Sequence, residues 1–342
     1  MGAVDVSGDH RLDDEGVWFQ VEEPGAVGTV RRAAELLAGR MGLDEAHAGA
    51  LAIVAAELAS NLVKHADSGQ LLVRPARNDE VAGVELIAVD SGPGMSDVVS
   101  STRDGHSTAG SLGIGLGAIG RQSSWFDVYS LPGRGTVSAA QVWPARAPEP
   151  DWIAGLSRPM SGEQSCGDGF AVRTVEGRRQ VLVCDGLGHG PLAAVAARAA
   201  VHAFHLAPAA PPAAVLEHLH RAISHTRGAA AAVAEFDPAA GLLRYAGLGN
   251  IAGSVQHYDE RRGLVSMPGI VGHQRRTVRE FDYPFPGGAC LVMHSDGVTD
   301  RWRLADYPGL LGRSPQVIAG TLLRDAAVRR DDACVLVARA TP

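Results

Sequence analysis

A proline-rich segment near the middle of the chain limits what this sequence can fold into. Residues 144–151 run Pro-Ala-Arg-Ala-Pro-Glu-Pro-Asp and show no hydrophobic periodicity. Proline lacks a backbone N–H and has a restricted φ angle, so such a segment favours an extended linker. The length of 342 residues suits two domains of ordinary size. We therefore expect one domain over residues 15–143, a linker over 144–152 and a second domain over 153–342.

Composition and charge exclude several classes of protein. Hydrophobic residues make up 46% of the chain and charged residues 20%, which is typical of globular domains. The net charge of -7 and the absence of a dense Lys/Arg run argue against a nucleic-acid partner. We find no basic-then-apolar secretion signal and no apolar stretch long enough to span a bilayer. We expect a cytoplasmic protein with no membrane partner and with buried, reduced cysteines, whereas the oligomeric state stays open.

Both halves mix helices and strands in their hydrophobic patterns. In the first half, Asp44 is a candidate N-cap for the second helix. There we expect helices over 27–40 and 44–66, and strands over 70–74, 84–90, 125–131 and 136–143. In the second half we expect strands over 169–175, 180–185, 241–246, 289–295 and 333–339, and helices over 192–206 and 212–226. These patterns predict a mixed α/β (α+β) protein, with an α/β/β/α sandwich in the second half.

The first candidate site begins on the second predicted helix. Glu57 and Asn61 are four residues apart and so share one face of that helix. The Asn61 carbonyl oxygen is a suitable Mg²⁺ ligand, and Glu57 could orient or deprotonate an attacking hydroxyl. The alternative is a solvated polar face.

Two glycine-containing segments follow in the sequence. Asp90-Ser-Gly92-Pro-Gly94 ends a predicted strand, where a carboxylate can accept a hydrogen bond from an adenine amino group and glycines allow close approach of a ligand. Residues 110–120 then carry repeated glycines, whose backbone N–H groups can face phosphate at the start of a helix. A glycine run alone is weak support, but the order of the three segments is specific.

The three segments together resemble the N, G1 and G2 boxes of the GHKL ATPase superfamily, in its anti-sigma-factor serine kinase branch, over about residues 17–143. The resemblance implies a two-layer α/β sandwich that binds ATP with Mg²⁺. It implies Glu57 as catalytic base, Asn61 as Mg²⁺ ligand and Asp90 as adenine contact. The implied nucleotide-cradling positions are Gly92, Gly94, Gly113, Gly115 and Gly117. For Arg103, a γ-phosphate contact and an exposed loop position both stay open, as do ligand contact and packing for His65.

The second candidate site consists of acids beside predicted strand ends. These are Asp168, Asp185, Asp296 and the pair Asp331-Asp332. Any single Asp-Gly pair is most simply a turn. Jointly, carboxylates at one end of a sheet suit Mg²⁺ or Mn²⁺, and two such ions can support hydrolysis of a phosphate ester. A thiolate mechanism at Cys166 is conceivable, but no Cys-x₅-Arg loop follows it.

This acid pattern resembles the PP2C family of serine/threonine phosphatases, in its SpoIIE and RsbX-like branch, over about residues 157–340. Asp185-Gly-Leu-Gly-His-Gly190 is the most specific element. The resemblance implies two Mn²⁺ or Mg²⁺ ions. The implied ligands are Asp168, Asp185, Asp296 and Asp331, with the backbone carbonyl of Gly186. We favour Asp331 over Asp332, and His189 is equally suited to contact phosphate or to complete the glycine turn.

Both resemblances together imply a bifunctional serine/threonine kinase and phosphatase. Its expected partner is a STAS-domain antagonist protein in a sigma-factor partner-switching pathway. One alternative is an anti-sigma factor that binds sigma directly, which co-purification of a sigma factor would reveal. The other is a nucleotide-binding regulatory scaffold without turnover.

Overall fold

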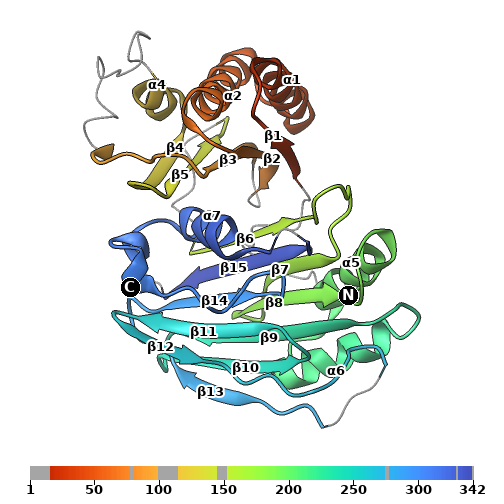
Figure 1. The fold of residues 1–342 in the computed structure, drawn as a ribbon. Helices are drawn as coiled ribbons and strands as arrows, with labels where there is room; N and C mark the ends of the chain where they lie inside the picture. Colours follow the sequence, from red (N-terminus) through yellow and green to blue (C-terminus); the bar gives the residue numbers. More distant parts are fainter. Residues whose placement is uncertain are drawn as a thin grey trace. The chain divides into compact units, whose positions relative to one another are not determined.

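The computed structural model describes residues 16–77, 81–98, 115–144, 152–273, 277–328 and 330–340 (Figure 1). These residues form two compact units. The N-terminal unit comprises residues 16–144 together with 307–324, and the C-terminal unit comprises 152–306 together with 325–340. Gly113 and Arg103 lie outside the described residues.

The N-terminal unit contains one antiparallel sheet with the strand order β1-β2-β3-β5-β4. Strand β1 was not predicted from the sequence. The other strands agree with the predicted ones to within a few residues at each end. The strands are β1 (Val17–Gln20), β2 (Gly69–Arg77), β3 (Ala82–Asp90), β4 (Trp125–Leu131) and β5 (Gly135–Val142).

Three helices cover one face of this sheet: α1 (Pro24–Met41), α2 (Glu45–His65) and α4 (Gly115–Gln122) (Figure 1). Asp44 caps α2 as predicted, because its side chain accepts a hydrogen bond from the His47 backbone N–H at 2.9 Å. Among the described residues, α2 alone is long and apolar enough to meet a simple criterion for a membrane span. Its Leu51 and Leu58 are buried in the core between helices and sheet, as in the core helix of a globular domain.

The N-terminal unit also contains a segment from late in the chain, residues 307–324. This segment holds a 3₁₀ turn over Leu310–Gly312 and most of α7 (Pro315–Ala326). The Asp127 carboxylate of β4 accepts the backbone N–H of Ser314 at 2.8 Å. Gly320 packs directly on the sheet, since a Cβ there would lie 2.8 Å from Val137 Cγ1.

The C-terminal unit contains two five-stranded sheets, β13-β10-β9-β8-β7 and β12-β11-β14-β15-β6. Apolar side chains from both sheets form a shared core, which includes Phe170, Val183, Leu291 and Leu336. The strands are β6 (Ile153–Arg158), β7 (Asp168–Val175), β8 (Arg178–Gly186), β9 (Ala229–Asp237), β10 (Leu242–Leu248), β11 (Ala252–His257), β12 (Glu260–Gly263), β13 (Phe281–Pro284), β14 (Cys290–His294) and β15 (Ala333–Arg339). The expected mixed α/β class is therefore confirmed.

Helices α5 (Pro191–Leu206) and α6 (Pro212–Ala222) cover the outer face of the first sheet (Figure 1). Alanines on α5 allow close packing on this sheet, and Phe204 fills the space at its end. Pro191 occupies the first turn of α5 as predicted. The predicted end of α6 at residue 226 was wrong, because the chain leaves the helix after Ala222 and Thr226 enters a turn that leads into β9.

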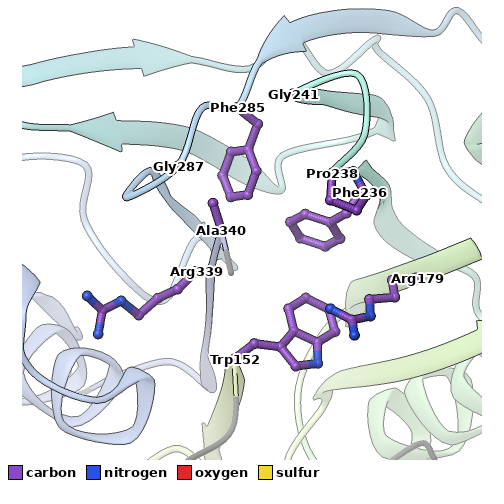
Figure 2. A pocket seen from close by; sticks show the side chains of 9 residues that line it. All are labelled: Trp152, Arg179, Phe236, Pro238, Gly241, Phe285, Gly287, Arg339 and Ala340. Atoms are coloured by element: carbon purple, nitrogen blue, oxygen red, sulfur yellow. The ribbon is translucent and has the colours of Figure 1, made fainter. Parts of the chain in front are cut away.

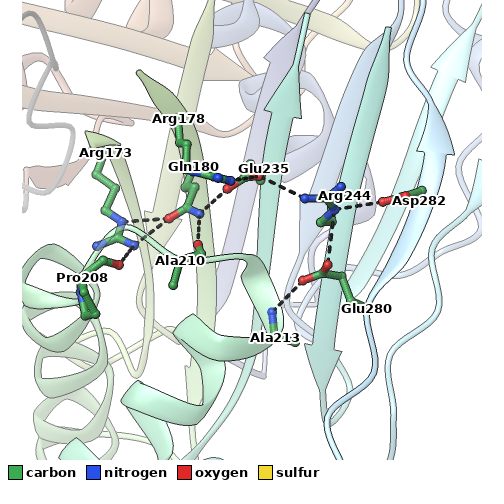
Figure 3. A network of polar contacts seen from close by, with 10 residues as sticks. All are labelled: Arg173, Arg178, Gln180, Pro208, Ala210, Ala213, Glu235, Arg244, Glu280 and Asp282. Carbon is green, nitrogen blue, oxygen red and sulfur yellow. Dashed lines mark hydrogen bonds and ion pairs between the residues drawn. The ribbon is translucent and has the colours of Figure 1, made fainter. Parts of the chain in front are cut away.

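A buried polar network ties the first sheet to the connection between α5 and α6 (Figure 3). Arg173 Nη2 donates to Gln180 Oε1 at 2.6 Å, and Gln180 Nε2 donates to Glu235 Oε2 at 2.6 Å. Arg173 Nη1 also donates to the carbonyl oxygen of Phe204 at 2.8 Å. Because buried polar groups are costly when unpaired, this network fixes the far ends of β7, β8 and β9 in register.

Two candidate active sites

The first candidate site lies where α2 meets the start of α4. Glu57 and Asn61 are half-buried on the same face of α2. Gly115 begins α4 directly against them, since a Cβ on Gly115 would lie 3.4 Å from Asn61 Oδ1 and 3.8 Å from Glu57 Oε2. The structure therefore brings Glu57, Asn61 and Gly115 together, and Gly117 lies in the first turn of the same short helix.

The Asp90 loop lies next to the end of α2. Asp90 Oδ1 accepts the backbone N–H of Gly92 at 2.9 Å, and burial raises the pKa of this carboxyl group. A Cβ on Gly92 would lie 2.5 Å from the carbonyl oxygen of His65, the last residue of α2. Gly94 has a φ of +65°, and a Cβ there would lie 2.0 Å from the Leu131 carbonyl oxygen. These contacts explain why the loop requires glycine at both positions.

The second candidate site lies at one end of the C-terminal sandwich. Asp168 begins β7 and Asp185 is the second-last residue of β8, and the two residues are directly paired across the antiparallel ladder. The neighbouring backbone is close-packed, because the N–H of Gly186 donates to the Gly167 carbonyl oxygen at 2.9 Å. A Cβ on Gly186 would lie 2.3 Å from the Ala193 carbonyl oxygen, so only glycine fits between β8 and α5.

Burial and mutual repulsion raise the pKa of several of these aspartates. Burial, followed by repulsion from Asp296, raises the pKa of Asp185 from 3.8 to about 7. Burial and the charge of Asp185 raise the pKa of Asp168 well above its usual range. Asp331 has a raised pKa for the same reasons, burial first and Asp296 second. Like charges are gathered in a low-dielectric position, where a bound cation would relieve the repulsion.

Neighbouring residues hold these aspartates in place, and two of them were missed in the sequence analysis. Ser295 Oγ donates to Asp168 Oδ2 at 2.5 Å and accepts the Cys334 backbone N–H at 2.9 Å. Asn250 Nδ2 donates to Asp296 Oδ2 at 2.6 Å. Ser295 adjoins Asp296 in sequence, which could have drawn attention to it, whereas Asn250 lies 46 residues away in a loop.

The two acids of the Asp331-Asp332 pair have different environments. Both Asp332 oxygens accept backbone N–H groups, from Met160 and from Gly167, each at 2.7 Å. Asp331 is more exposed, and its Oδ1 accepts the Asp332 backbone N–H at 3.0 Å. Asp332 therefore closes the loop between β6 and β7, and the charges of both acids act on Asp185.

The rim of this site carries His189, whose Nδ1 lies 3.6 Å from Glu163 Oε1. All four cysteines are free thiols; Cys184, Cys290 and Cys334 are buried as expected, whereas Cys166 is only half-buried. Burial and the charge of Asp168 raise the pKa of Cys166 far above its usual range. A Cys166 thiolate nucleophile is therefore disfavoured.

A separate small cavity lies at the opposite end of the sandwich (Figure 2). Its lining includes Trp152, Phe236, Phe285 and Arg179. Strand β8 runs from Arg178 to Gly186, so Arg179 is at the end of the strand far from Asp185. The Arg179 guanidinium lies 5.3 Å from the centre of the Trp152 ring. This cavity is not part of the acidic site.

The donors at the acidic site suit a hard divalent cation. They are carboxylate oxygens, a ligand type that Mg²⁺ and Mn²⁺ prefer. Within the ranges described, no three His, Cys, Asp or Glu side chains form a ready-made metal-binding group. The fit rests instead on the donor types and on the mutual repulsion among Asp168, Asp185, Asp296 and Asp331.

Comparisons with known proteins find relatives of both regions of the chain. Residues 21–138 match the family model of the histidine kinase-like ATPase domain, and residues 176–341 match that of Stage II sporulation protein E (SpoIIE). Serine/threonine-protein kinase RsbT of Bacillus subtilis (strain 168) is 31% identical over 113 residues, which are 33% of this chain and 85% of RsbT.

Solved structures are similar as well. One is described as "The bacterial stressosome: a modular system that has been adapted to control secondary messenger signaling" and is 30% identical, with a TM-score of 0.51, covering 55% of this chain and 98% of that chain. A crystal structure of RsbX in complex with magnesium is 19% identical, with a TM-score of 0.47, covering 55% of this chain and 94% of that chain.

The fold and the matched families thus define a protein in which a histidine kinase-like ATPase region precedes a PP2C-like phosphatase region. The chain belongs to the RsbT family of serine/threonine-protein kinases through its N-terminal region, and its C-terminal region is of the SpoIIE type.

Proposed function

We propose that this protein adds phosphate to, and removes phosphate from, a serine or threonine of a STAS-domain protein in a cytoplasmic partner-switching pathway that controls a sigma factor. The observation that carries the proposal is the presence of two separate sites in one chain. One combines Glu57 and Asn61 with a glycine-bounded loop, and the other gathers aspartates at a sheet end. Phosphate adds up to about two negative charges, enough to make or break a protein contact.

In the kinase half, the chain's residues position ATP and the acceptor hydroxyl. Asp90 would accept a hydrogen bond from the adenine amino group, and the Asn61 carbonyl oxygen would hold Mg²⁺. Glu57 would take the proton from the serine or threonine hydroxyl as that oxygen attacks the γ-phosphate. The contact of Gly115 with both side chains supports this arrangement, because it places the start of α4 where phosphate groups would lie.

In the phosphatase half, two Mn²⁺ or Mg²⁺ ions would be held by Asp168, Asp185, Asp296, Asp331 and the backbone carbonyl of Gly186. When bound, such ions polarise the phosphate ester and activate a water molecule for attack. Ser295 orients Asp168, and Asn250 orients Asp296. We assign the ligand role to Asp331 because both oxygens of Asp332 already accept backbone N–H groups. His189 would contact the phosphate at the rim.

The phosphatase is tested with purified protein, Mn²⁺ and para-nitrophenyl phosphate. We expect Mn²⁺-dependent hydrolysis. Asp296→Ala should lower its rate at least about a hundredfold, because alanine supplies no ligand in place of the lost carboxylate. Asp259→Ala removes an exposed aspartate in the β11–β12 turn and serves as the matched control. Absence of hydrolysis by folded wild type with Mn²⁺ would count against the phosphatase.

The kinase is tested with radiolabelled ATP and a STAS-domain protein. Glu57→Gln keeps the shape of the side chain but removes the base, so we expect ATP binding to persist while transfer falls about 100- to 10,000-fold. Calorimetric ATP titration alongside the transfer assay separates binding from catalysis. Equal transfer by wild type and Glu57→Gln would remove Glu57 from the proposed role.

A further inference from the structure

A groove adjoins the acidic site on the C-terminal unit. Its volume is about 450 Å³, which falls in the range of roughly 300–1,000 Å³ typical of ligand sites. A single phosphate group would occupy a small part of it. The lining comes from the loop after β10, from β11, from β12 with the segment that follows, and from the segment after β14, and includes Asn250, Gly253, Arg261, Gly263, Ser266 and Asp300.

Asn250 joins the groove to the acidic site. Its side chain lines the groove and also donates to Asp296 Oδ2 at 2.6 Å. A group that enters the acidic site beside Asp296 therefore leaves the rest of its molecule at the Asn250 end of the groove. This continuity points to an occupant that carries a phosphate ester and extends well beyond it.

One wall of the groove is held rigidly. Arg261 donates to the Asp300 backbone carbonyl at 2.9 Å, forms an ion pair with the Asp300 carboxylate, and stacks on the Trp302 ring at 4.6 Å. Asp300 also faces His294 Nε2 at 3.3 Å. Hydrogen bonding to His294, and then to Arg261, lowers the pKa of Asp300 to about 2. The wall therefore keeps its charge and shape throughout the neutral pH range.

The same wall offers a sheet edge. Strand β12 is the outermost strand of its sheet and pairs with β11 on one side, and all four of its residues are exposed. Edge strands present backbone N–H and C=O groups that an extended peptide can pair with. The exposed charges near this edge are of both signs: Arg262, Arg301 and Arg303 are basic, and Asp259 and Glu260 are acidic.

We infer that this groove receives the polypeptide on either side of the phosphorylated residue, as an extended segment along β12, with Asn250 at the point where the phosphoryl group enters the acidic site. The inference rests on the proposed phosphatase function and adds a docking surface for the substrate protein. Recognition of this kind is mainly through the backbone, so the groove accepts a serine or threonine phosphate in an extended or locally unfolded segment.

Gly263 allows a direct test, because a Cβ at this position would meet no atom within 4 Å and its φ is not in the left-handed region. Gly263→Leu therefore fills the groove without displacing the surrounding chain. Gly287 has the same open surroundings at the far end of the sandwich, and Gly287→Leu is the matched control. Thermal unfolding of both variants checks that each folds as wild type does.

The probes are phosphoserine casein, an unfolded phosphoprotein, and para-nitrophenyl phosphate, which is too small to reach along the groove. We expect Gly263→Leu to lower the ratio of casein to aryl phosphate hydrolysis at least about tenfold, mainly through KM, because ground-state binding is lost. Gly287→Leu should keep the wild-type ratio. An unchanged ratio in Gly263→Leu overturns the inference, as does a wild type that hydrolyses aryl phosphate but not casein. A wild type that hydrolyses neither substrate overturns the phosphatase proposal itself, so the two failures are distinguishable.

Discussion

Replacing Asp185 by asparagine should make the metal-free protein more stable while removing its phosphatase activity. Asp185 carries a charge that burial and Asp296 both disfavour, and its pKa is raised from 3.8 to about 7. Asparagine has nearly the same shape without the charge. The substitution therefore removes the repulsion and keeps the packing.

The magnitude follows from the pKa shift. A carboxyl group whose pKa rises from 3.8 to about 7 on folding destabilises the folded state by about 4 kcal/mol at a pH where it is ionised in both the folded and the unfolded state. Asp168 shares this repulsion and water screens part of it, so we expect one substitution to recover about 2 kcal/mol. For a region of this size that corresponds to a rise in Tm of about 4 to 8 °C.

The direction of the pKa shift determines how the stabilising effect of Asp185→Asn changes with pH. Because the folded pKa is above the unfolded value, the native state binds more protons between about pH 4 and pH 7, and stability falls as pH rises through that window. The advantage of Asp185→Asn should thus be largest near pH 8 and fall to less than half of that at about pH 5. Scanning calorimetry of chelator-treated protein at both pH values measures it.

The control is Asp259→Asn, which changes an exposed aspartate of the same domain. We expect no change in its Tm beyond about 1 °C, as for most exposed substitutions. If Asp185→Asn has no higher Tm than Asp259→Asn at pH 8, or if its advantage grows toward pH 5, the aspartates do not repel one another as the structure implies.

Three further outcomes are expected. Mn²⁺ should raise the Tm of wild type and raise that of Asp185→Asn less, since ligand binding to the native state stabilises it by mass action; equal shifts would contradict metal binding at Asp185. Gly94→Ala forces a side chain into a left-handed backbone position and against a carbonyl oxygen, so it should cost about 1–3 kcal/mol of stability and weaken ATP binding in calorimetric titration. Gln180→Leu leaves Arg173 and Glu235 without their shared buried partner. It should lower the free energy of unfolding, measured by urea denaturation, by about 3 kcal/mol. An unchanged free energy of unfolding would show that water replaces the Gln180 side chain.

Local chemistry explains the successful predictions. Asp44 could be predicted as an N-cap because its carboxylate accepts a hydrogen bond from a backbone N–H in the first turn of the helix that follows it. Glu57 and Asn61 are four residues apart, and residues at this spacing lie on the same face of a helix. Their proximity could therefore be predicted without tertiary information. The pairing of Asp168 with Asp185 was not predicted, since it depends on the register of two strands.

Strand β9 shows where local chemistry misleads. It begins with four alanines, and alanine favours helix in isolation. In the folded protein this segment is the central strand of its sheet, paired with β8 on one side and β10 on the other. Its small side chains are buried, some in the core between the two sheets and others beneath α5 and α6. Burial on both faces outweighs intrinsic propensity.

The sequence alone determined the mixed α/β class and the order of the two regions, and it indicated the acids and glycines proposed for both sites, because these depend on residue type and short spacing. Only the tertiary structure decided which residues support those acids. Asn250 contacts Asp296 across 46 residues, and Ser295 contacts Asp168 across 127. Such contacts arise when strands from distant parts of the chain end at the same edge of a sandwich, and no local pattern encodes them.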